Sequence, residues 1–492
     1  MAVICDKVKR TVQHCQERIM STKHSVRDKA SQVKFSKRLE MVNRSAAGVD
    51  VGSTEMWVCA PAGEGAVEVK LFGAYTRDLR DISGWLRAHG VATVAMESTG
   101  VYWIPLFQRL ERDGFEVFLV NARFVKSVGG RPKTDIHDCQ WIQRLHSYGL
   151  LPKSFRPDDA VCRLRAVVRH RGALVRESST QVQRIQKALH EMNLQLDKAI
   201  SDITGVTGLR ILEAILSGMR DPMALAELRD KRIAASKETV AAALEGDYRD
   251  EGLFIVRQCL DSYYAFRGQI DQCDQWLGKC LAEMAGKAKA EAVDNDKAEV
   301  VDDKAERGKA GHPKGKKQTR NAPALDVGGL VLALAGVDLT RIDGLGPGTV
   351  MEIVAETGFD MGKWPTSEHF ASWLGLCPNL KISNSKVQSS QSKRNQSRAA
   401  KAFRLGAQAL CRSRSYLGAF YRRMRARIGG AKANTATARK LAVIFYTMLA
   451  TGRQYEDLGE DHYEKRHRER ALKGLKLKAE SMGYELVERK TA

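Results

Sequence analysis

Four acidic side chains in the first third of the chain have the types and spacing that could bind a divalent metal ion. Asp50 lies in GVDVG and Glu97 in AMESTG, each at an apolar run, whereas Asp135 and Asp138 are three residues apart in KTDIHDCQW. On a helix, that spacing places two Cβ atoms about 5–6 Å apart on one face. Carboxylate oxygens suit Mg²⁺ or Mn²⁺, and two such ions roughly 3.5–4 Å apart promote phosphodiester cleavage. The pattern therefore predicts a metal-binding catalytic site.

The elements around these carboxylates indicate how they could meet. AAGVDVG, EMWVCAPA and AVEVKLFGAYT are short β-type runs that predict a three-strand meander, and a helix is expected over residues 77–89. VATVAMES and FEVFLVN predict two more strands, which alternate with the helical runs VYWIPLFQRLERDG and TDIHDCQWIQRLHSYGL. This is the element order of an RNase H-like domain, expected over residues 46–156.

In that order the first and fourth strands are neighbours, so Asp50 and Glu97 can face one pocket. Asp50 is expected in the middle of its strand, where an unpaired charge costs several kcal/mol unless it is compensated. Lys133 is a candidate phosphate contact beside the aspartate pair, while His137 points away from their helix face at helical spacing. An isolated Asp-x-x-Asp is usually a solvated surface feature, so the prediction rests on all four carboxylates converging.

The middle of the chain predicts long helices over residues 157–284. Apolar residues follow a heptad seam that is broken by Arg171 and Ser178: Leu164, Val168, Val175, Val182, Ile185, Leu189, Met192 and Leu196. A coiled-coil dimer and a helix hairpin within one chain both satisfy this seam. Residues 285–323 contain no aromatic residue, Leu or Ile, which predicts a disordered linker over 285–328.

A second folded domain is expected over residues 329–455. LTRIDGLGPGTVMEIVAETG predicts two helices joined by a glycine hairpin, which could present backbone N–H groups to a phosphate. Residues 381–440 contain sixteen Lys and Arg and no Asp or Glu, a pattern that favours binding along a phosphate backbone. The interleaved Tyr416, Phe420 and Tyr421 could stack on bases or pack in the core. A basic extension over 1–45 and a basic tail over 456–492 complete the chain.

Bulk composition favours a polyanionic partner. The 492 residues include 80 Lys and Arg against 58 Asp and Glu, a net charge of +22. The chain has no apolar run long enough to span a membrane, and its ten cysteines form no C-x-x-C pair, so we expect a cytoplasmic, nucleoid-associated protein. GVDVGS and LDVGG at 325–329 also suggest the two phosphate loops of actin-like and sugar-kinase-like ATPases, but the helices expected after LDVGG argue against that fold.

Five motifs in order resemble the DEDD transposases of bacterial insertion sequences, the family numbered one-ten with its eleven-eleven relatives. They are GVDVGS, AMESTGVYW, VNARFVKSVGGRPKTDIHD, IDGLGPGT, and WLGLCPNLKISNSK with NQSRAAKAFRLGAQAL. The resemblance implies a Holliday-junction-resolvase-like N-terminal domain joined through a coiled coil to a C-terminal transposase domain. It also implies DNA recombination guided by a structured RNA made by the element, with donor and target DNA as partners.

The resemblance also assigns site residues. Asp50, Glu97, Asp135 and Asp138 match the acidic tetrad of the family. A serine nucleophile stands in a stretch that usually reads Ser-Gly-Gly-Lys, and here ISNSK places it at Ser383, with Lys386 as the lysine and Asn384 and Ser385 replacing the glycines. The predicted nucleic-acid contacts are Lys133, Lys386, Lys393, Arg394, Arg398 and Arg404.

A metal-assisted attack by Ser383 on DNA would form a phosphoserine intermediate, and it requires the two domains to meet within one chain or across a homodimer or tetramer. Two other functions remain open from the residues alone. A structure-selective nuclease would use the four carboxylates and water without the serine. A non-catalytic nucleic-acid-binding protein would need neither.

Overall fold

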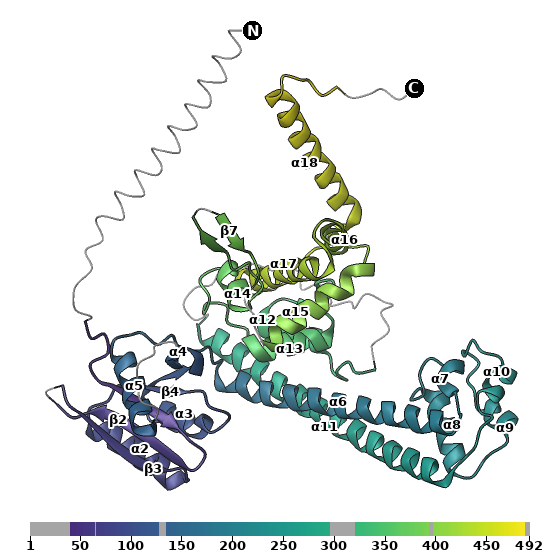
Figure 1. Cartoon of the computed structure of the whole chain (residues 1–492), viewed down its shortest axis with the longest axis horizontal. Coiled ribbons are helices and arrows are strands. Elements are labelled where there is room, and N and C mark those ends of the chain that lie inside the picture. Colours follow the sequence, from purple (N-terminus) through teal and green to yellow (C-terminus); the bar gives the residue numbers. More distant parts are fainter. Residues whose placement is uncertain are drawn as a thin grey trace. The chain divides into compact units, whose positions relative to one another are not determined.

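The computed structural model describes residues 40–63, 65–126, 134–295, 320–384, 386–392 and 397–487, with the backbone alone over 288–295. The chain divides into two compact units, residues 1–156 and 157–492, each described by itself (Figure 1). Lys133, Lys393 and Arg394, together with most of the predicted extension over 1–45, lie outside the described residues.

A five-stranded sheet forms the centre of the first unit. Its strands are β1 Ala46–Val51, β2 Glu55–Pro61, β3 Val67–Gly73, β4 Thr93–Glu97 and β5 Glu116–Val120. They lie in the order β3-β2-β1-β4-β5, with β1 to β3 antiparallel and β4 parallel to both β1 and β5. The predicted meander and the predicted contact between the first and fourth strands are both confirmed.

Helices cover both faces of this sheet, which explains why β1 is buried along almost its whole length. They are α2 Thr76–Ala88, α3 Trp103–Arg112, α4 Ala122–Lys126 and α5 Asp135–Ser147. Ile82 of α2 and Leu106 of α3 pack with Val49 and Met96 on one face. On the other face, Ile142 and Leu145 of α5 pack with Ala95 and Val120. The alternation of side chains along each strand therefore sends odd and even residues of β1 to different helices.

Two long helices dominate the first half of the second unit. Helices α6 Asp159–Glu191 and α11 Asp250–Asn295 lie side by side, and four short helices pack at one end of the pair (Figure 1). The short helices are α7 Leu196–Ala199, α8 Val206–Leu216, α9 Pro222–Glu227 and α10 Lys237–Ala242. Ile185 and Leu189 of α6 share one core with Val256 and Leu260 of α11. The heptad seam is thus covered within the chain by α11, as the helix-hairpin alternative predicted.

Arg171, one of the two polar residues that interrupt the heptad seam, has an ion-pair partner on the opposite helix. The Nε and Nη2 atoms of Arg171 donate to the two carboxylate oxygens of Asp274, at 2.5 and 3.0 Å. Arg171 is 8% exposed and Asp274 4% exposed, so this bidentate ion pair is buried. Asp274 also accepts a hydrogen bond from the backbone N–H of Ala324 (2.9 Å), which attaches the segment before α12 to the helix pair.

The predicted linker is shorter at both ends than expected. Helix α11 continues to Asn295, because the Ala, Lys and Glu residues after position 285 are strong helix formers that need no core to remain helical. Helix α12 Val327–Ala335 begins inside the predicted linker, where the Asp326 side chain caps it by accepting from the backbone N–H of Gly329 (3.0 Å). LDVGG is therefore a helix start and not the second phosphate loop of an ATPase.

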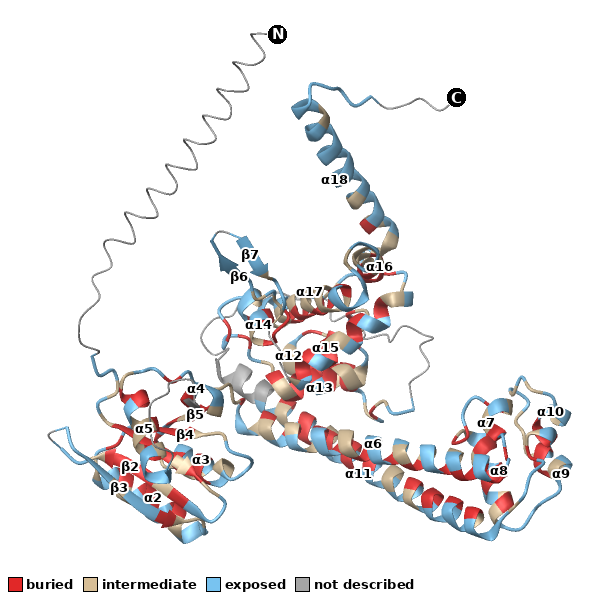
Figure 2. Cartoon of the chain, in the orientation of Figure 1, coloured by how far each residue is buried: buried red, intermediate tan, exposed pale blue. Residues whose placement is uncertain are grey.

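The rest of the second unit is a helical domain with one small β-hairpin. Its elements are η2 Leu339–Arg341, α13 Pro347–Thr357, α14 Ser367–Trp373, β6 Lys381–Ser383, β7 Lys386–Ser389, α15 Arg398–Ala409, η3 Leu410–Arg412, α16 Tyr416–Ile428, α17 Gly430–Thr451 and α18 Gly459–Ser481. Phe370, Phe403 and Phe445 are fully buried and join α14, α15 and α17. By contrast, α18 is almost entirely exposed, with Tyr463 its one buried residue (Figure 2).

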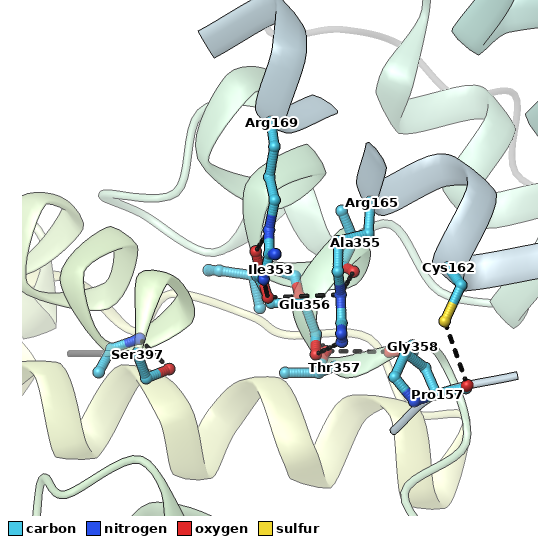
Figure 3. A network of polar contacts seen from close by, with 11 residues as sticks. Pro157, Cys162, Arg165, Arg169, Ile353, Ala355, Glu356, Thr357, Gly358 and Ser397 are labelled. Carbon is cyan, nitrogen blue, oxygen red and sulfur yellow. Dashed lines mark hydrogen bonds and ion pairs between the residues drawn. The ribbon is translucent and has the colours of Figure 1, made fainter. Parts of the chain in front are cut away.

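Two arginines of α6 hold the end of α13 (Figure 3). Arg165 donates to the backbone carbonyls of Ala355 (3.0 Å) and Glu356 (2.7 Å), and Arg169 donates to both carboxylate oxygens of Glu356 at 2.8 Å each. The last carbonyls of a helix lack partners within the helix, and a guanidinium group satisfies them while complementing the negative end of the helix dipole. These contacts fix the helical domain to the long helix pair.

Candidate active site

Asp50 and Glu97 lie side by side at one edge of the sheet. Asp50 is the next-to-last residue of β1, not a mid-strand residue as predicted, and Glu97 ends β4. Val49 pairs with Met96 in the parallel register, and both pack toward α2 and α3. Because side chains alternate along strands, Asp50 and Glu97 belong to the opposite face, which α5 covers. Both residues are half-buried.

Helix α5 can lie close to this face because β1 has a glycine at position 48. A Cβ atom on Gly48 would lie 2.2 Å from the backbone N of Gln143 and 2.4 Å from the carbonyl O of Cys139. The helix backbone therefore rests directly on the strand, two residues before Asp50. Gln143 also donates from Nε2 to the carbonyl of Ala46 at 3.2 Å. Sequence reasoning missed Gly48, although a glycine inside a buried strand indicates a close backbone approach.

Burial and charge around Cys139 show how near Asp50 lies to α5. A hydrogen bond with Cys59 of β2 raises the pKa of the Cys139 thiol, followed by burial, and the negative charge of Asp50 acts in the same direction. Cys139 directly follows Asp138 in the first turn and a half of α5. The start of α5 and the end of β1 therefore belong to one neighbourhood.

The aspartate pair begins α5, as predicted. Thr134 is the N-cap, and its hydroxyl accepts from the backbone N–H of His137 at 3.3 Å. Asp135 is exposed and Asp138 is half-buried. The positive end of the helix dipole stabilises negative charge in this turn. The His137 ring lies 2.5 Å from the Thr134 hydroxyl, so His137 supports the cap.

Asp50 and Glu97 lie on the face of the sheet that α5 covers, and Asp135 and Asp138 begin α5, but the structure does not gather the four carboxylates into a finished metal site. Among residues 40–487, as far as they are described, no group of three or more His, Cys, Asp or Glu side chains is close enough to hold a metal ion. The donor set itself fits a hard divalent cation, since all four side chains offer carboxylate oxygens. The tetrad thus remains a prediction.

Ser383 lies on the small β-hairpin of the second unit. It is the last residue of β6 and pairs across the hairpin with Lys386 of β7. Asn384 follows with φ of +49°, the left-handed conformation that the family glycines would adopt most readily. The expectation that asparagine permits this tight turn is confirmed. Ser383 and Lys386 are both exposed, as are Ile382 (62%) and Val387 (59%) on the same hairpin.

The other predicted cations differ in their surroundings. Arg398 is exposed in the first turn of α15. Arg404 is half-buried, with Nη2 at 3.5 Å from the carbonyl of Gly375. Of the aromatic residues in this region, Tyr421 is buried in the core, whereas Phe420 is half-buried with its ring 6.3 Å from that of Tyr463.

The predicted glycine hairpin packs tightly against α15. Its first helix is only the short 3₁₀ turn η2, and α13 follows it. Gly344 has φ of +89°, and a Cβ atom there would lie 2.7 Å from the carbonyl of Gly406 on α15. A side chain at position 344 would be strained by the positive φ and would also clash with α15. Glycine is therefore required both by the turn and by the packing.

The sheet order, with an antiparallel meander followed by two parallel strands, defines the first unit as an RNase H-like domain. Two family models match the chain: residues 47–194 match the DEDD transposases of IS110, and residues 338–422 match the transposases of the IS116/IS110/IS902 family. Both matches are to transposases of the IS110 family, and together they support a DEDD-type transposase of this family, an enzyme that cuts and rejoins DNA.

Solved structures of RuvC from Thermus thermophilus, alone and in complex with a Holliday junction substrate, also match. Each has 15% sequence identity and a TM-score of 0.18, over 22% of this chain and 99% of the RuvC chain. No curated protein matches the chain at a significant level. None of the described helices combines the length and the apolarity that crossing a membrane requires.

Proposed function

We propose that this transposase cuts and rejoins DNA through a covalent phosphoserine intermediate at Ser383. The observation that carries the proposal is the hairpin: it exposes a serine hydroxyl next to the left-handed turn at Asn384 and across from the Lys386 ammonium. A serine in this position can approach a phosphate without displacing core residues. Lys386 would neutralise part of the phosphate charge.

Asp50, Glu97, Asp135 and Asp138 would hold Mg²⁺ or Mn²⁺ at the edge of the sheet. When bound, such an ion polarises the scissile phosphate and lowers the pKa of the attacking hydroxyl. The chain's own contribution would be to bring carboxylates from two strands and one helix together, with Gly48 allowing α5 to lie close to β1. These carboxylates can also accept the proton that the serine releases.

The reaction is a pair of phosphoryl transfers. The Ser383 oxygen forms a bond to phosphorus, the bond from phosphorus to one sugar oxygen breaks, and the released sugar hydroxyl takes up a proton. In the second step, a free hydroxyl of another DNA end attacks the same phosphorus and releases Ser383 with its proton restored. Because each step exchanges one phosphate ester for another, no nucleoside triphosphate is consumed.

The charge of the chain and its resemblance to the family both favour nucleic acids as partners. The net charge of +22 and the one-sign stretch over 381–440 favour phosphate binding by donor DNA, target DNA and a structured guide RNA of the element. The carboxylates belong to the first unit and Ser383 to the second. The two units must therefore meet during the reaction, within one chain or between copies in a homodimer or tetramer.

A labelled DNA junction carrying the element ends tests the serine. Wild-type protein with Mg²⁺ and guide RNA should form an adduct that survives denaturation, and Ser383→Ala should reduce it by at least 100-fold, since the nucleophile is gone. Ser372→Ala, exposed on α14 and away from the hairpin, is the matched control and should retain the adduct. Persistence of the adduct in Ser383→Ala would show that another residue is the nucleophile.

The same assay separates the competing functions. A nuclease that uses water would cleave the junction without any adduct, even in the wild-type protein. A non-catalytic binding protein would show neither product, and Asp135→Asn would leave its function unchanged. We expect Asp135→Asn to abolish the adduct while DNA binding persists, and the exposed Asp81→Asn on α2 to behave as wild type.

A further inference from the structure

A large cavity lies at the base of the hairpin that carries Ser383. Its volume is about 1000 Å³, which is at the upper end of the range for small-molecule sites. The rim includes Pro378 and Ser392, which form an isolated β-bridge at the foot of the hairpin. Helix α17 supplies one wall, with lining residues at the spacing of a single helix face: Ala431, Lys432, Thr435, Ala436, Arg439, Lys440 and Val443.

The lining combines cations with apolar surface. Lys432, Arg439 and Lys440 line the cavity together with one carboxylate, Glu368. Among the described residues, no ion pair joins any of these three cations to a carboxylate within 4.0 Å. The Nε atom of Arg439 is buried and has no hydrogen-bond partner in the part of the chain that the structure describes. Three cations against one carboxylate give the lining a net positive charge, which favours an anionic occupant.

The apolar part of the lining includes an aromatic ring. Phe420 lines the cavity, and the Lys440 Nζ lies 4.6 Å from its ring centroid and 4.8 Å from that of Tyr416. Burial lowers the pKa of Lys440, and Arg470 and Arg466 add to this effect by charge repulsion. An anion beside Lys440 would relieve that repulsion. Leu376 and Pro378 add flat apolar surface, and Ser389 to Ser392 add hydrogen-bonding groups.

We propose that this cavity binds an unstacked nucleotide of a single-stranded nucleic acid, with the base against Phe420 and Pro378 and a phosphate at Lys432 and Arg439. The inference deepens the proposed function, on which it rests, because the cavity and Ser383 share one hairpin. A base removed from its stack at this point would fix the register of the strand relative to the nucleophile. DNA and RNA offer the same chemistry, so the strand of origin is decided by experiment.

Photocrosslinking of full-length protein in EDTA tests the site without catalysis. Single-stranded DNA with 4-thiothymidine and single-stranded RNA with 4-thiouridine serve as the probes, and mass spectrometry locates the crosslinked peptides. We expect crosslinks in residues 416–443 from one of the two probes, which identifies the strand. Crosslinks confined to peptides outside the cavity lining would overturn the proposal.

Binding by cavity variants supplies the second measurement. Filling the cavity with Ala436→Phe should weaken binding of the crosslinked probe about 10-fold or more, as expected when a stacked base is lost. Ala450→Phe, exposed on the same helix outside the cavity, is the bulk-matched control and should change binding less than 2-fold. Lys432→Gln should weaken binding more than Lys231→Gln, which removes an equal charge from an exposed loop. Thermal unfolding verifies that each variant is folded.

The outcomes distinguish the two proposals. If the wild-type protein binds neither probe, the proposed nucleic-acid function fails together with the cavity. If it binds a probe and forms the Ser383 adduct, but folded Ala436→Phe binds as tightly as wild type, only the cavity assignment is wrong.

Discussion

The stability of the first unit should depend on pH through one buried side chain, His146. It is 1% exposed beneath the sheet, its Nε2 lies 2.9 Å from the Thr93 hydroxyl, and its ring centroid lies 4.6 Å from that of Phe118, with the two rings tilted by 53°. Burial lowers its pKa to about 4, Glu116 opposes the shift, and Lys153 adds to it. The folded protein therefore holds a neutral imidazole where the unfolded chain, with an ordinary pKa near 6.5, would carry a charge.

We expect the first unit to lose stability as pH falls from 6.5 to 4. Over this range the unfolded state binds a proton that the folded state rejects, and the difference between a pKa of 6.5 and one of about 4 corresponds to about 3 kcal/mol of unfolding free energy. Hydrogen exchange of β4 and β5 peptides should show this loss, and His146→Gln should flatten the slope. His369→Gln, exposed in the second unit, should leave the slope of β4 unchanged. An equal slope in His146→Gln would contradict the assignment.

Helix α5 depends on a single glycine for its position. The backbone atoms of Cys139 and Gln143 occupy the space that a Cβ on Gly48 would need. Overpacking of this kind typically costs about 1–3 kcal/mol, because rigid backbone and not a flexible side chain must move. Any movement of α5 also moves Asp135 and Asp138 relative to β1.

Gly48→Ala should therefore reduce the yield of the DNA adduct even where the variant remains folded. The expected loss of adduct is at least 10-fold, because a displacement of about 1 Å at a catalytic site can lower the reaction rate by this much or more. Gly84→Ala on α2 is the matched control: its Cβ would meet open space, and alanine in a helix gains roughly 0.5–1 kcal/mol. Wild-type activity in Gly48→Ala would show that α5 does not position the site.

The long helix pair contains a second element-scale test. Asp274→Ala leaves Arg171 buried without its carboxylate partner, which should destabilise the second unit by roughly 3–5 kcal/mol. Glu191→Ala, which breaks an exposed pair with Lys187 on α6, should cost less than about 0.5 kcal/mol. Urea unfolding of both variants compares them directly, and similar costs would mean that the buried pair contributes no more than a surface pair.

At the scale of the whole molecule, the distribution of charge indicates which surface binds nucleic acid. Glu460 and Glu464 of α18 pair with Arg422 and Arg423 of α16. The hairpin and the start of α15 present cations without acidic neighbours in sequence, including Lys381, Lys386 and Arg398. Binding along this surface should release counterions from phosphates.

The affinity for duplex DNA should accordingly fall by about 10³–10⁵ between 50 and 200 mM salt, if six to ten phosphates are contacted, as is typical of such proteins. Replacing Lys381, Lys386 and Arg398 with glutamine should reduce the slope of log K against log salt by about 0.9 per lost contact. Fluorescence anisotropy at several salt concentrations measures both. An unchanged slope in the triple variant would place the DNA elsewhere.

Local pattern in the sequence determined the strands, their order and the start of α5, because side-chain alternation, helical periodicity and the Thr134 cap act over a few residues. It also placed Asp50 and Glu97 on neighbouring strands. The four-carboxylate site and the role of Ser383 stay predictions.

Only the tertiary structure decided what depends on distant partners. Arg171 interrupts the heptad seam in the sequence, and the structure explains it by an ion pair with Asp274, a residue far along the chain. The burial of His146, the close approach over Gly48 and the basic cavity below Ser383 likewise arise from elements that meet in space. Sequence periodicity reports which face of an element is apolar, whereas packing decides which element covers that face.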